Sequence, residues 1–199
     1  MSPRNPARRA ERPKVRDLQQ YAGHHVPDLR GPGARLLFVG INPGLWSAAT
    51  EAHFARPGNR FYPALAAAGI TPYLVDARAG FRPEDRRMLV QRGIAITNIV
   101  SKATARADEL STAELREGAR LLPDRVTAIA PRVVAFLGLT SYRTAFGRRD
   151  ALAGRQQIQI AGRPVWVLPN PSGLNAHETV ASLAAAYAEP AREAGVLEG

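Results

Sequence analysis

The sequence predicts an α/β protein, a three-layer α/β/α sandwich around a mainly parallel central sheet. Apolar runs short enough for strands recur along the chain, and segments of helical periodicity separate them. Strands that alternate with helices are typical of parallel sheets whose two faces are covered by helices. The first strand, ARLLFVGI at 34–41, is apolar throughout, as expected for a strand buried on both faces.

The next elements follow the same alternation. We expect short helices at 59–69 and 82–93, and a second strand, GIAITNIV, at 93–100. This second strand is rich in β-branched residues, which favour extended backbone.

A long helix is expected at 111–130. Ser111 and Glu114 have the spacing of a capping box, which marks the start of a helix. Pro123 lies inside this segment and predicts a kink or a restart, because proline cannot donate a helical hydrogen bond. The third strand, RVVAFLGL, follows at 132–139.

The last third of the chain completes the sheet. A short helix at 140–149, capped by Thr140, is followed by a strand, a tight turn and a last strand within 156–169. The segment 178–193 has the periodicity of a closing helix.

Charge and composition divide the chain into two parts. Residues 1–30 are basic, rich in proline and without periodicity, so we interpret them as a flexible arm ahead of one domain at 31–199. The formal net charge of the whole chain is +10. Such an excess attracts polyanions, although solubility alone is an alternative explanation.

Several classes of protein are excluded or disfavoured. The chain has no cysteine, which rules out disulfides, zinc–thiolate sites and iron–sulfur clusters. No apolar run approaches a membrane span, and the basic start lacks the apolar segment of a secretory signal. The nucleotide-binding glycine motifs and paired-histidine metal motifs are also missing, so we expect no cofactor and no bound metal. The lack of cysteine and of a secretory signal is compatible with the cytoplasm, where we expect the protein to act.

Three asparagines follow predicted strands directly. Asn42 opens the Asn-Pro-Gly turn after the first strand, Asn98 ends the second, and Asn170 opens Asn-Pro-Ser-Gly after the last. Asn-Pro and Pro-Gly are good turn formers, and each turn alone needs no further explanation. Because the carboxyl ends of parallel strands meet at one edge, where ligands bind, the repetition favours a site.

The chemistry of such a site is limited by its residue types. An asparagine amide donates and accepts hydrogen bonds without becoming charged. Asn42 is therefore suited to position a water molecule rather than to deprotonate it. A water molecule that is positioned but not deprotonated is a sufficient nucleophile in a reaction whose leaving group departs before the attack.

These motifs resemble those of the mismatch-specific uracil-DNA glycosylases, the family that includes thymine-DNA glycosylase. GINPG at 40–44 matches the first motif of that family, and NPSGL at 170–174 matches the second in its bacterial form. HFARPGNRF, TNIV and ELREGARLL lie between them in matching order. The resemblance covers about residues 34–190. It implies a uracil-DNA glycosylase-like fold and hydrolytic removal of uracil, thymine or ethenocytosine mispaired with guanine in duplex DNA.

The resemblance also implies roles for individual residues. Asn42 would hold the attacking water, and Phe54 would stack on the flipped base. Backbone groups of Ile41 and Phe54 would contact the edge of that base. Asn98 and His53, which match the animal enzymes rather than the bacterial ones, would also belong to the base site. Phe61 is expected to pack in the core.

A second group of residues is expected to contact the DNA helix. Leu174 would fill the gap that the flipped base leaves, although it could instead be a hydrophobic staple for the next helix. Ser172, Gly173 and Asn175 would contact the DNA backbone, and Asn175 with Glu178 has the spacing of a helix cap. Lys102 is expected to contact a phosphate.

The second motif departs from the bacterial family, which continues with arginine where this chain reads Asn175-Ala176-His177. Recognition of the partner guanine therefore stays open. Asp108 is the carboxylate most suited to assist the attacking water. The alternative interpretation is that Asp108 is a surface acid ahead of a helix.

Two other classes of function compete with a glycosylase. One is a non-cleaving module that binds lesions or DNA, which the presence of Asn42 disfavours. The other is a nucleotide-binding α/β protein with a small-molecule substrate, which the arginine excess and Leu174 disfavour. We expect a monomeric bacterial enzyme without lyase activity, acting on nucleoid DNA.

Overall fold

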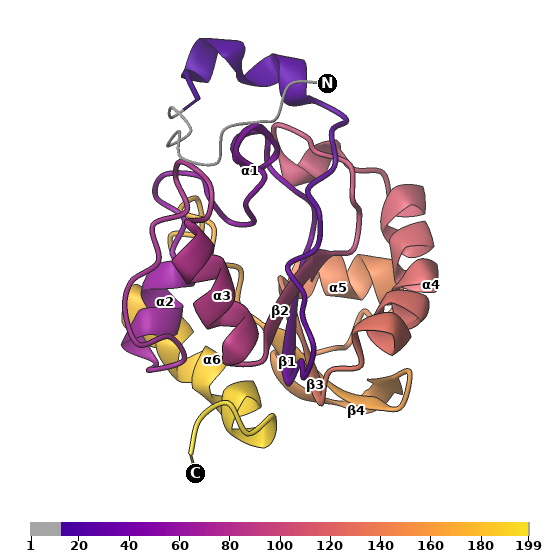
Figure 1. Ribbon diagram of the computed structural model, residues 1–199. Helices are drawn as coiled ribbons and strands as arrows, with labels where there is room; N and C mark the ends of the chain where they lie inside the picture. Colours follow the sequence, from indigo (N-terminus) through magenta and orange to yellow (C-terminus); the bar gives the residue numbers. More distant parts are fainter. Residues whose placement is uncertain (1–12, 199) are drawn as a thin grey trace.

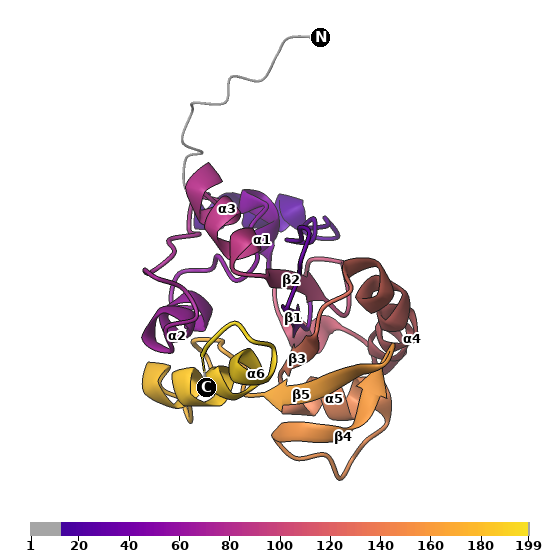
Figure 2. The ribbon, with the colours of Figure 1, turned by 60° about the horizontal axis from the view of Figure 1, so that its bottom comes forward.

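The computed structural model describes residues 13–198 and shows a sheet with helices packed against both of its faces (Figure 1). The described strands are β1 (Leu36–Gly40), β2 (Ile94–Asn98), β3 (Val133–Leu137), β4 (Gly154–Ile160) and β5 (Arg163–Leu168). They lie in the order β2-β1-β3-β5-β4 (Figure 2). Only the β4–β5 pairing is antiparallel, so the predicted mainly parallel sheet is confirmed.

Helices form the two outer layers. The α-helices of the described chain are α1 (Leu45–Thr50), α2 (Phe61–Ala67), α3 (Pro83–Gln91), α4 (Thr112–Ile129), α5 (Leu139–Phe146) and α6 (Val180–Glu193). Two short 3₁₀ helices are η1 (Val15–Tyr21) and η2 (Ala107–Glu109). Helices α2, α3 and α6 cover one face of the sheet, and α4 and α5 cover the other (Figure 1).

Alternation along the strands explains the two cores. Leu36 and Phe38 of β1 point into the cluster formed with α2, α3 and α6. Leu37 and Val39, one residue out of phase, point into the cluster under α4 and α5. Successive side chains of a strand face opposite sides, so an entirely apolar strand is buried between two helical layers.

The capping box at the start of α4 is confirmed, because Ser111 and Glu114 each accept a hydrogen bond from the backbone N–H of the other. The predicted restart at Pro123 is wrong, since α4 continues through this residue to Ile129. The predicted cap of α5 is also wrong. Helix α5 starts at Leu139 with Gly138 as its N-cap, which leaves Thr140 inside the first turn.

The cap of α6 requires a third correction. Thr179 and Ser182 form a capping box at its start, and the helix begins at Val180. Asn175 and Glu178 lie before this cap, in the preceding loop. Both residue pairs have the same spacing, and the pair next to the apolar helix is the one that caps it.

The predicted boundary of the arm at residue 30 falls within packed chain. We call residues 23–30 the N-terminal strap. Leu29 is fully buried and exchanges two backbone hydrogen bonds with Ile96 of β2, at 3.0 and 2.8 Å. Gly23 and His24 likewise bond to the backbone of Ala103. The fold therefore includes the strap, while the start of the predicted arm, residues 1–12, lies outside the described residues.

No helix within residues 13–198 is long and apolar enough to cross a membrane.

Candidate active site

The asparagines that follow β1, β2 and β5 meet at one edge of the sheet. Asn42, Asn98 and Asn170 all line a cavity of about 310 Å³ at the carboxyl ends of these strands. This is the edge where open α/β sheets bind their ligands.

Most of the predicted site residues line this cavity. Those that do so are Ile41, Asn42, His53, Phe54, Asn98, Asp108, Ser172 and Leu174. Gly173, Asn175 and Lys102 are not part of its lining. The structure thus brings the base-site and water-site candidates together with Ser172, and leaves the other predicted backbone-contacting residues outside the lining.

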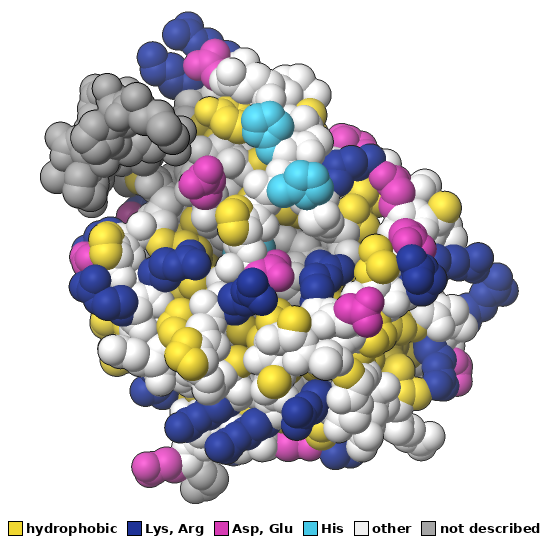
Figure 3. Space-filling view, turned by 45° about the vertical axis from the view of Figure 1, so that its right-hand side comes forward, with side chains coloured by type: hydrophobic (Ala, Val, Ile, Leu, Met, Phe, Trp, Pro, Cys, Tyr) yellow, Lys and Arg dark blue, Asp and Glu magenta, His cyan; other side chains and the backbone are white. Residues whose placement is uncertain are grey.

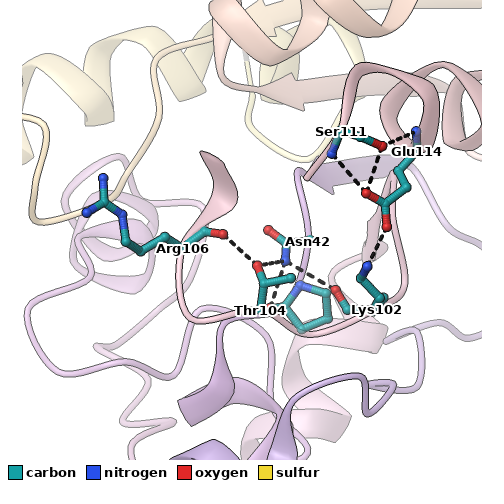
Figure 4. A network of polar contacts seen from close by, with 7 residues as sticks. Asn42, Lys102, Thr104, Arg106, Ser111 and Glu114 are labelled. Carbon is teal, nitrogen blue, oxygen red and sulfur yellow. Dashed lines mark hydrogen bonds and ion pairs between the residues drawn. The ribbon is translucent and has the colours of Figure 1, made fainter. Parts of the chain in front are cut away.

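The amide of Asn42 is held by a loop that follows β2. Its Nδ2 donates to Thr104 Oγ1 at 2.7 Å, and it contacts the carbonyls of Pro43 at 3.1 Å and Lys102 at 3.2 Å (Figure 4). Thr104 Oγ1 in turn donates to the Arg106 carbonyl at 2.7 Å, so its lone pair is the part that faces Asn42.

These contacts determine which atom of the amide remains available. Carbonyl oxygens only accept hydrogen bonds, so the nitrogen of Asn42 must face them. Its Oδ1 points away from this network in Figure 4 and has no hydrogen-bond partner among residues 13–198. Asn42 therefore offers an acceptor rather than the donor and acceptor expected from its residue type.

Thr104 was not predicted from the sequence. A threonine six residues after Asn98 carries no local signal, and its role depends on a contact with Asn42 across 62 positions of sequence.

Lys102 lies behind this loop and is already paired. Its Nζ forms an ion pair with Glu114, the acid of the α4 capping box (Figure 4). Hydrogen bonds from Lys102 and Ser111 lower the pKa of Glu114 to about 2. The lysine amine therefore points to a carboxylate and not into the cavity.

Asp108 lies at the rim of the cavity, in η2. Both of its carboxylate oxygens accept hydrogen bonds from the Arg106 guanidinium, and its side chain is 61% exposed. The guanidinium occupies one lone pair on each oxygen, so a water molecule can reach only the remaining lone pairs of this carboxylate. The contacts of Asp108 in this structure are therefore those of a surface acid, which was the alternative to a catalytic role.

His53 and Asn98 form a buried pair on the floor of the cavity. Asn98 Nδ2 lies 3.1 Å from His53 Nδ1, and His53 Nε2 lies 3.0 Å from the Pro27 carbonyl of the strap. Burial lowers the pKa of His53 from 6.5 to about 4, so the ring is neutral at physiological pH.

Two aromatic rings form the wall beside this pair. Phe54 stacks on Phe61 with ring centroids 4.1 Å apart, and Phe61 is fully buried, as predicted for a packing residue. Phe54 is held with φ at 56°, a strained left-handed conformation that costs about 1–3 kcal/mol. A Cβ on Gly40 would lie 3.1 Å from its ring and 2.4 Å from Asn98 Oδ1, so only glycine leaves this space open.

We call residues 170–178 the wedge loop. Leu174 at its tip is 76% exposed and lines the cavity mouth, so it packs under no helix and the staple alternative is wrong. A Cβ on Gly173 would lie 2.6 Å from the Gly58 carbonyl. This close approach lets the loop rest against the segment that precedes α2.

Arg60 supports the wedge loop from beneath. Its guanidinium donates to the carbonyls of Ser172, Asn175 and Glu178, and its backbone N–H donates to the Pro171 carbonyl at 2.9 Å. The loop is thereby held by one side chain that lies more than a hundred residues earlier in the sequence.

The surface around the site is basic but not uniformly so. Arg56 and Arg106 belong to the cavity lining. On the face shown in Figure 3, Lys and Arg side chains are spread between acidic ones. Within residues 13–198, no group of three or more His, Asp or Glu side chains is arranged to hold a metal ion.

The fold and the site define an α/β protein with a cavity at the carboxyl edge of its sheet, and the polar lining of this cavity includes the amides of Asn42, Asn98 and Asn170. The chain belongs to the uracil DNA glycosylase superfamily, whose sequence model matches residues 27–191. Members of this superfamily are DNA glycosylases, hydrolases that act on DNA. The match begins in the strap, which agrees with the packing of that segment.

A solved structure shows the same fold. It is the solution NMR structure of a candidate uracil DNA glycosylase from Methanosarcina acetivorans, which is 15% identical in sequence. The match covers 84% of this chain and 98% of that one, with a TM-score of 0.57.

Proposed function

We propose that this protein is a monofunctional, mismatch-specific DNA glycosylase of the thymine-DNA glycosylase type. It flips uracil out of G·U mismatches in duplex DNA and hydrolyses its glycosidic bond, with thymine and ethenocytosine as further substrates. It acts as a monomer on the DNA of a bacterial cytoplasm and begins base excision repair.

The observation that carries this proposal is the state of the Asn42 amide. Its nitrogen is engaged by Thr104 and two carbonyls, while its oxygen is free at the cavity. A free neutral acceptor binds one O–H of a water molecule and directs the oxygen lone pair at the sugar. It does not remove the proton before the base has left.

The cavity supports base flipping as the first step. Leu174 is an exposed apolar side chain at the cavity mouth, where it can enter the duplex and occupy the vacated position. Extrusion of a mispaired base costs a few kcal/mol, which is less than for a base in a Watson–Crick pair. Arg56 and Arg106 belong to the cavity lining, and in this proposal their guanidinium groups contact the flanking phosphates.

The chemical step then needs little from the protein. The glycosidic bond breaks with its electron pair on the departing base, and the sugar cation is attacked by the water on Asn42. The proton of that water passes to solvent or to a free lone pair of Asp108, which lines the same cavity.

The state of Lys102 supports a hydrolase without lyase activity. Strand cleavage by a lyase requires an amine that forms a Schiff base with the sugar. Lys102 is the only lysine after residue 14, and it is paired with Glu114. Reduction with borohydride during the reaction should therefore trap no covalent protein–DNA adduct.

The decisive experiment is an excision assay on duplexes that pair G or A with uracil, thymine or ethenocytosine. The wild type should release uracil from G·U, leaving an intact abasic strand. Asn42→Ala should abolish release and bind the G·U duplex within a few fold of the wild type. Near-normal cleavage by this variant would contradict the role of Asn42 and make Asp108 the next candidate.

The alternative is a non-cleaving module that binds lesions with the same fold. It predicts tight and selective binding of the G·U duplex by the wild type, with no release of any of the three bases.

A further inference from the structure

Residues 102–104 hold the amide of Asn42 on one side and are themselves held on the other. Asn42 Nδ2 donates to the Lys102 carbonyl at 3.2 Å and to Thr104 Oγ1 at 2.7 Å. The backbone N–H of Thr104 also donates to the Pro43 carbonyl at 3.2 Å, in the turn that carries Asn42. The position of this short segment therefore sets the position of the Asn42 amide.

The opposite side of the segment pairs with the strap. The backbone N–H of Ala103 donates to the His24 carbonyl, and the Ala103 carbonyl accepts from the N–H of Gly23, both at 2.9 Å. In extended chain, successive residues direct their backbone groups to opposite sides. The residues on either side of Ala103 can therefore face Asn42 while Ala103 itself faces the strap.

A small apolar cluster places η1 over this pairing. Ala103 is buried together with Val26 of the strap and with Leu45 and Ala48 of α1. Side chains of η1 pack against the same cluster, so that η1 lies on α1 (Figure 1). Helix α1 starts directly after the Asn-Pro-Gly turn. The N-terminal part of the described chain thus covers both the turn that carries Asn42 and the loop that binds its amide.

The side chain of Lys102 supplies another support for this segment. Its Nζ forms an ion pair with Glu114 in the first turn of α4, and both side chains are partly exposed to solvent. An exposed ion pair at the end of a long side chain contributes little to holding a backbone in place. The two backbone hydrogen bonds to the strap are therefore the stronger support of residues 102–104.

We propose that η1 and the strap act as a clamp that holds residues 102–104 against the Asn42 turn and so keeps the Asn42 oxygen directed at the cavity. The clamp touches neither the base nor the water and acts by positioning alone. This inference rests on the proposed function, because it concerns the amide that holds the attacking water. It gives the N-terminal part of the chain a role in the chemical step as well as in the fold.

Gly23 allows the clamp to be loosened without a change in the site. Its φ is +79°, and a Cβ at this position would meet no atom within 4 Å, so only the backbone conformation limits substitution. Gly23→Val is strained at this φ, because β-branched residues avoid the left-handed region, whereas Gly23→Asn is the matched control that tolerates it. Leu29 keeps its two hydrogen bonds to Ile96 in both variants, so the fold should survive.

Single-turnover excision from a G·U duplex separates positioning from DNA contact. At saturating enzyme, Gly23→Val should lower the maximal excision rate roughly tenfold, because a small displacement of a positioning group is costly to the rate. The Kd for the duplex should be unchanged, and Gly23→Asn should retain the wild-type rate. A Gly23→Val variant with the full rate would overturn the inference, and so would one that weakens only the Kd.

Thr104→Val tests whether the clamp acts through the Asn42 amide. Both substitutions are expected to loosen the same amide, so the loss of rate in the double variant Gly23→Val/Thr104→Val should be smaller than the product of the two single losses. Losses that multiply would mean that the strap affects the rate by another route, and this result would overturn the inference.

Hydrogen exchange of the Asn42 side chain measures the clamp without any substrate. NMR of the nitrogen-labelled protein should show slow exchange of the Nδ2 protons in the wild type, because this nitrogen faces three acceptors, and faster exchange in Gly23→Val. Equal exchange in the two proteins would overturn the clamp and leave the proposed function intact. A wild type that releases no base from any duplex would contradict the proposed function, and the exchange rates would still decide whether the clamp holds the amide.

Discussion

Arg60 and Ser172 are joined by a hydrogen bond of 2.5 Å from the guanidinium to the backbone carbonyl, across 112 positions of sequence. The same guanidinium reaches the carbonyls of Asn175, at 2.6 Å, and Glu178. One side chain therefore fixes the wedge loop before DNA is bound, which removes an ordering cost from base flipping.

Replacement of Arg60 should consequently impair flipping more than chemistry. Arg60→Lys keeps the charge but cannot reach three carbonyls, because lysine lacks the planar fork of the guanidinium. We expect excision of uracil to fall about tenfold or more on duplex DNA and much less on single strands. Single-turnover rates on the two substrates measure this, and equal losses would mean that Arg60 serves only the general stability of the fold.

Leu174→Ala should show the same asymmetry without any loss of stability. Leu174 is exposed, so its truncation leaves no cavity in the core, and the melting temperature should stay near that of the wild type. Duplex uracil should lose activity, A·U more than G·U, because the stronger pair recloses more readily. An unchanged rate on A·U duplexes would show that Leu174 does not hold the helix open.

Thr104→Val should loosen the amide of Asn42. Valine has nearly the shape of threonine but removes the nearest of the three acceptors around Asn42 Nδ2, so Oδ1 is held toward the cavity less firmly. We expect the maximal excision rate to fall roughly tenfold while the Kd for duplex DNA changes little. Thr104→Ser retains the hydroxyl and is the control, and a Val variant as fast as the Ser variant would contradict the role.

His53 predicts an acid-sensitive fold. Burial depresses its pKa from 6.5 to about 4, with Asp28 opposing the shift and Arg86 adding to it. Between these values the unfolded chain binds the proton and the folded chain does not, so stability is full above pH 6.5 and falls as the pH drops toward 4. The loss should total about 3 kcal/mol. Urea unfolding of wild type and His53→Gln at several pH values isolates this contribution, which should be absent from the variant.

The arm should add interactions with phosphate that do not depend on sequence. Deletion of residues 1–12 removes Arg4, Arg8, Arg9 and Arg12 and leaves the strap in place. For each phosphate that the shortened chain no longer neutralises, the slope of log K against log salt should become shallower by about 0.9 on duplex DNA. A slope identical to that of the full chain would mean that this segment does not touch DNA.

The elements that the sequence predicted are those with local causes. Strands β1 and β3 were predicted because they are apolar runs, and β2 because it is rich in β-branched residues. The start of α4 was predicted because Ser111 and Glu114 cap it within four residues. The meeting of Asn42, Asn98 and Asn170 followed from one rule about parallel strands. The α6 cap was misplaced because two residue pairs share one spacing and only packing chooses between them.

The parts that the sequence did not predict depend on distant contacts. The Thr104 hydroxyl matters only because the loop after β2 folds back onto Asn42, and Arg60 only because the wedge loop closes over it. The packing of the strap could not be predicted, because the sequence of the strap has no periodic pattern. Its backbone pairs with β2 through Leu29 alone.

The strap also bears on the solubility of the protein. Strand β2 is one edge of the sheet, and an open edge offers unpaired backbone groups to any other chain with a free strand. Leu29 occupies part of that edge with two hydrogen bonds and a buried side chain. At the opposite edge, β4 carries the charged Arg155 and has an irregularity in its register with β5, and both features disfavour pairing with another strand. A chain that begins at residue 31 would leave the backbone groups of Ile96 in β2 unpaired. It should associate edge to edge and aggregate at concentrations where the full chain remains dispersed.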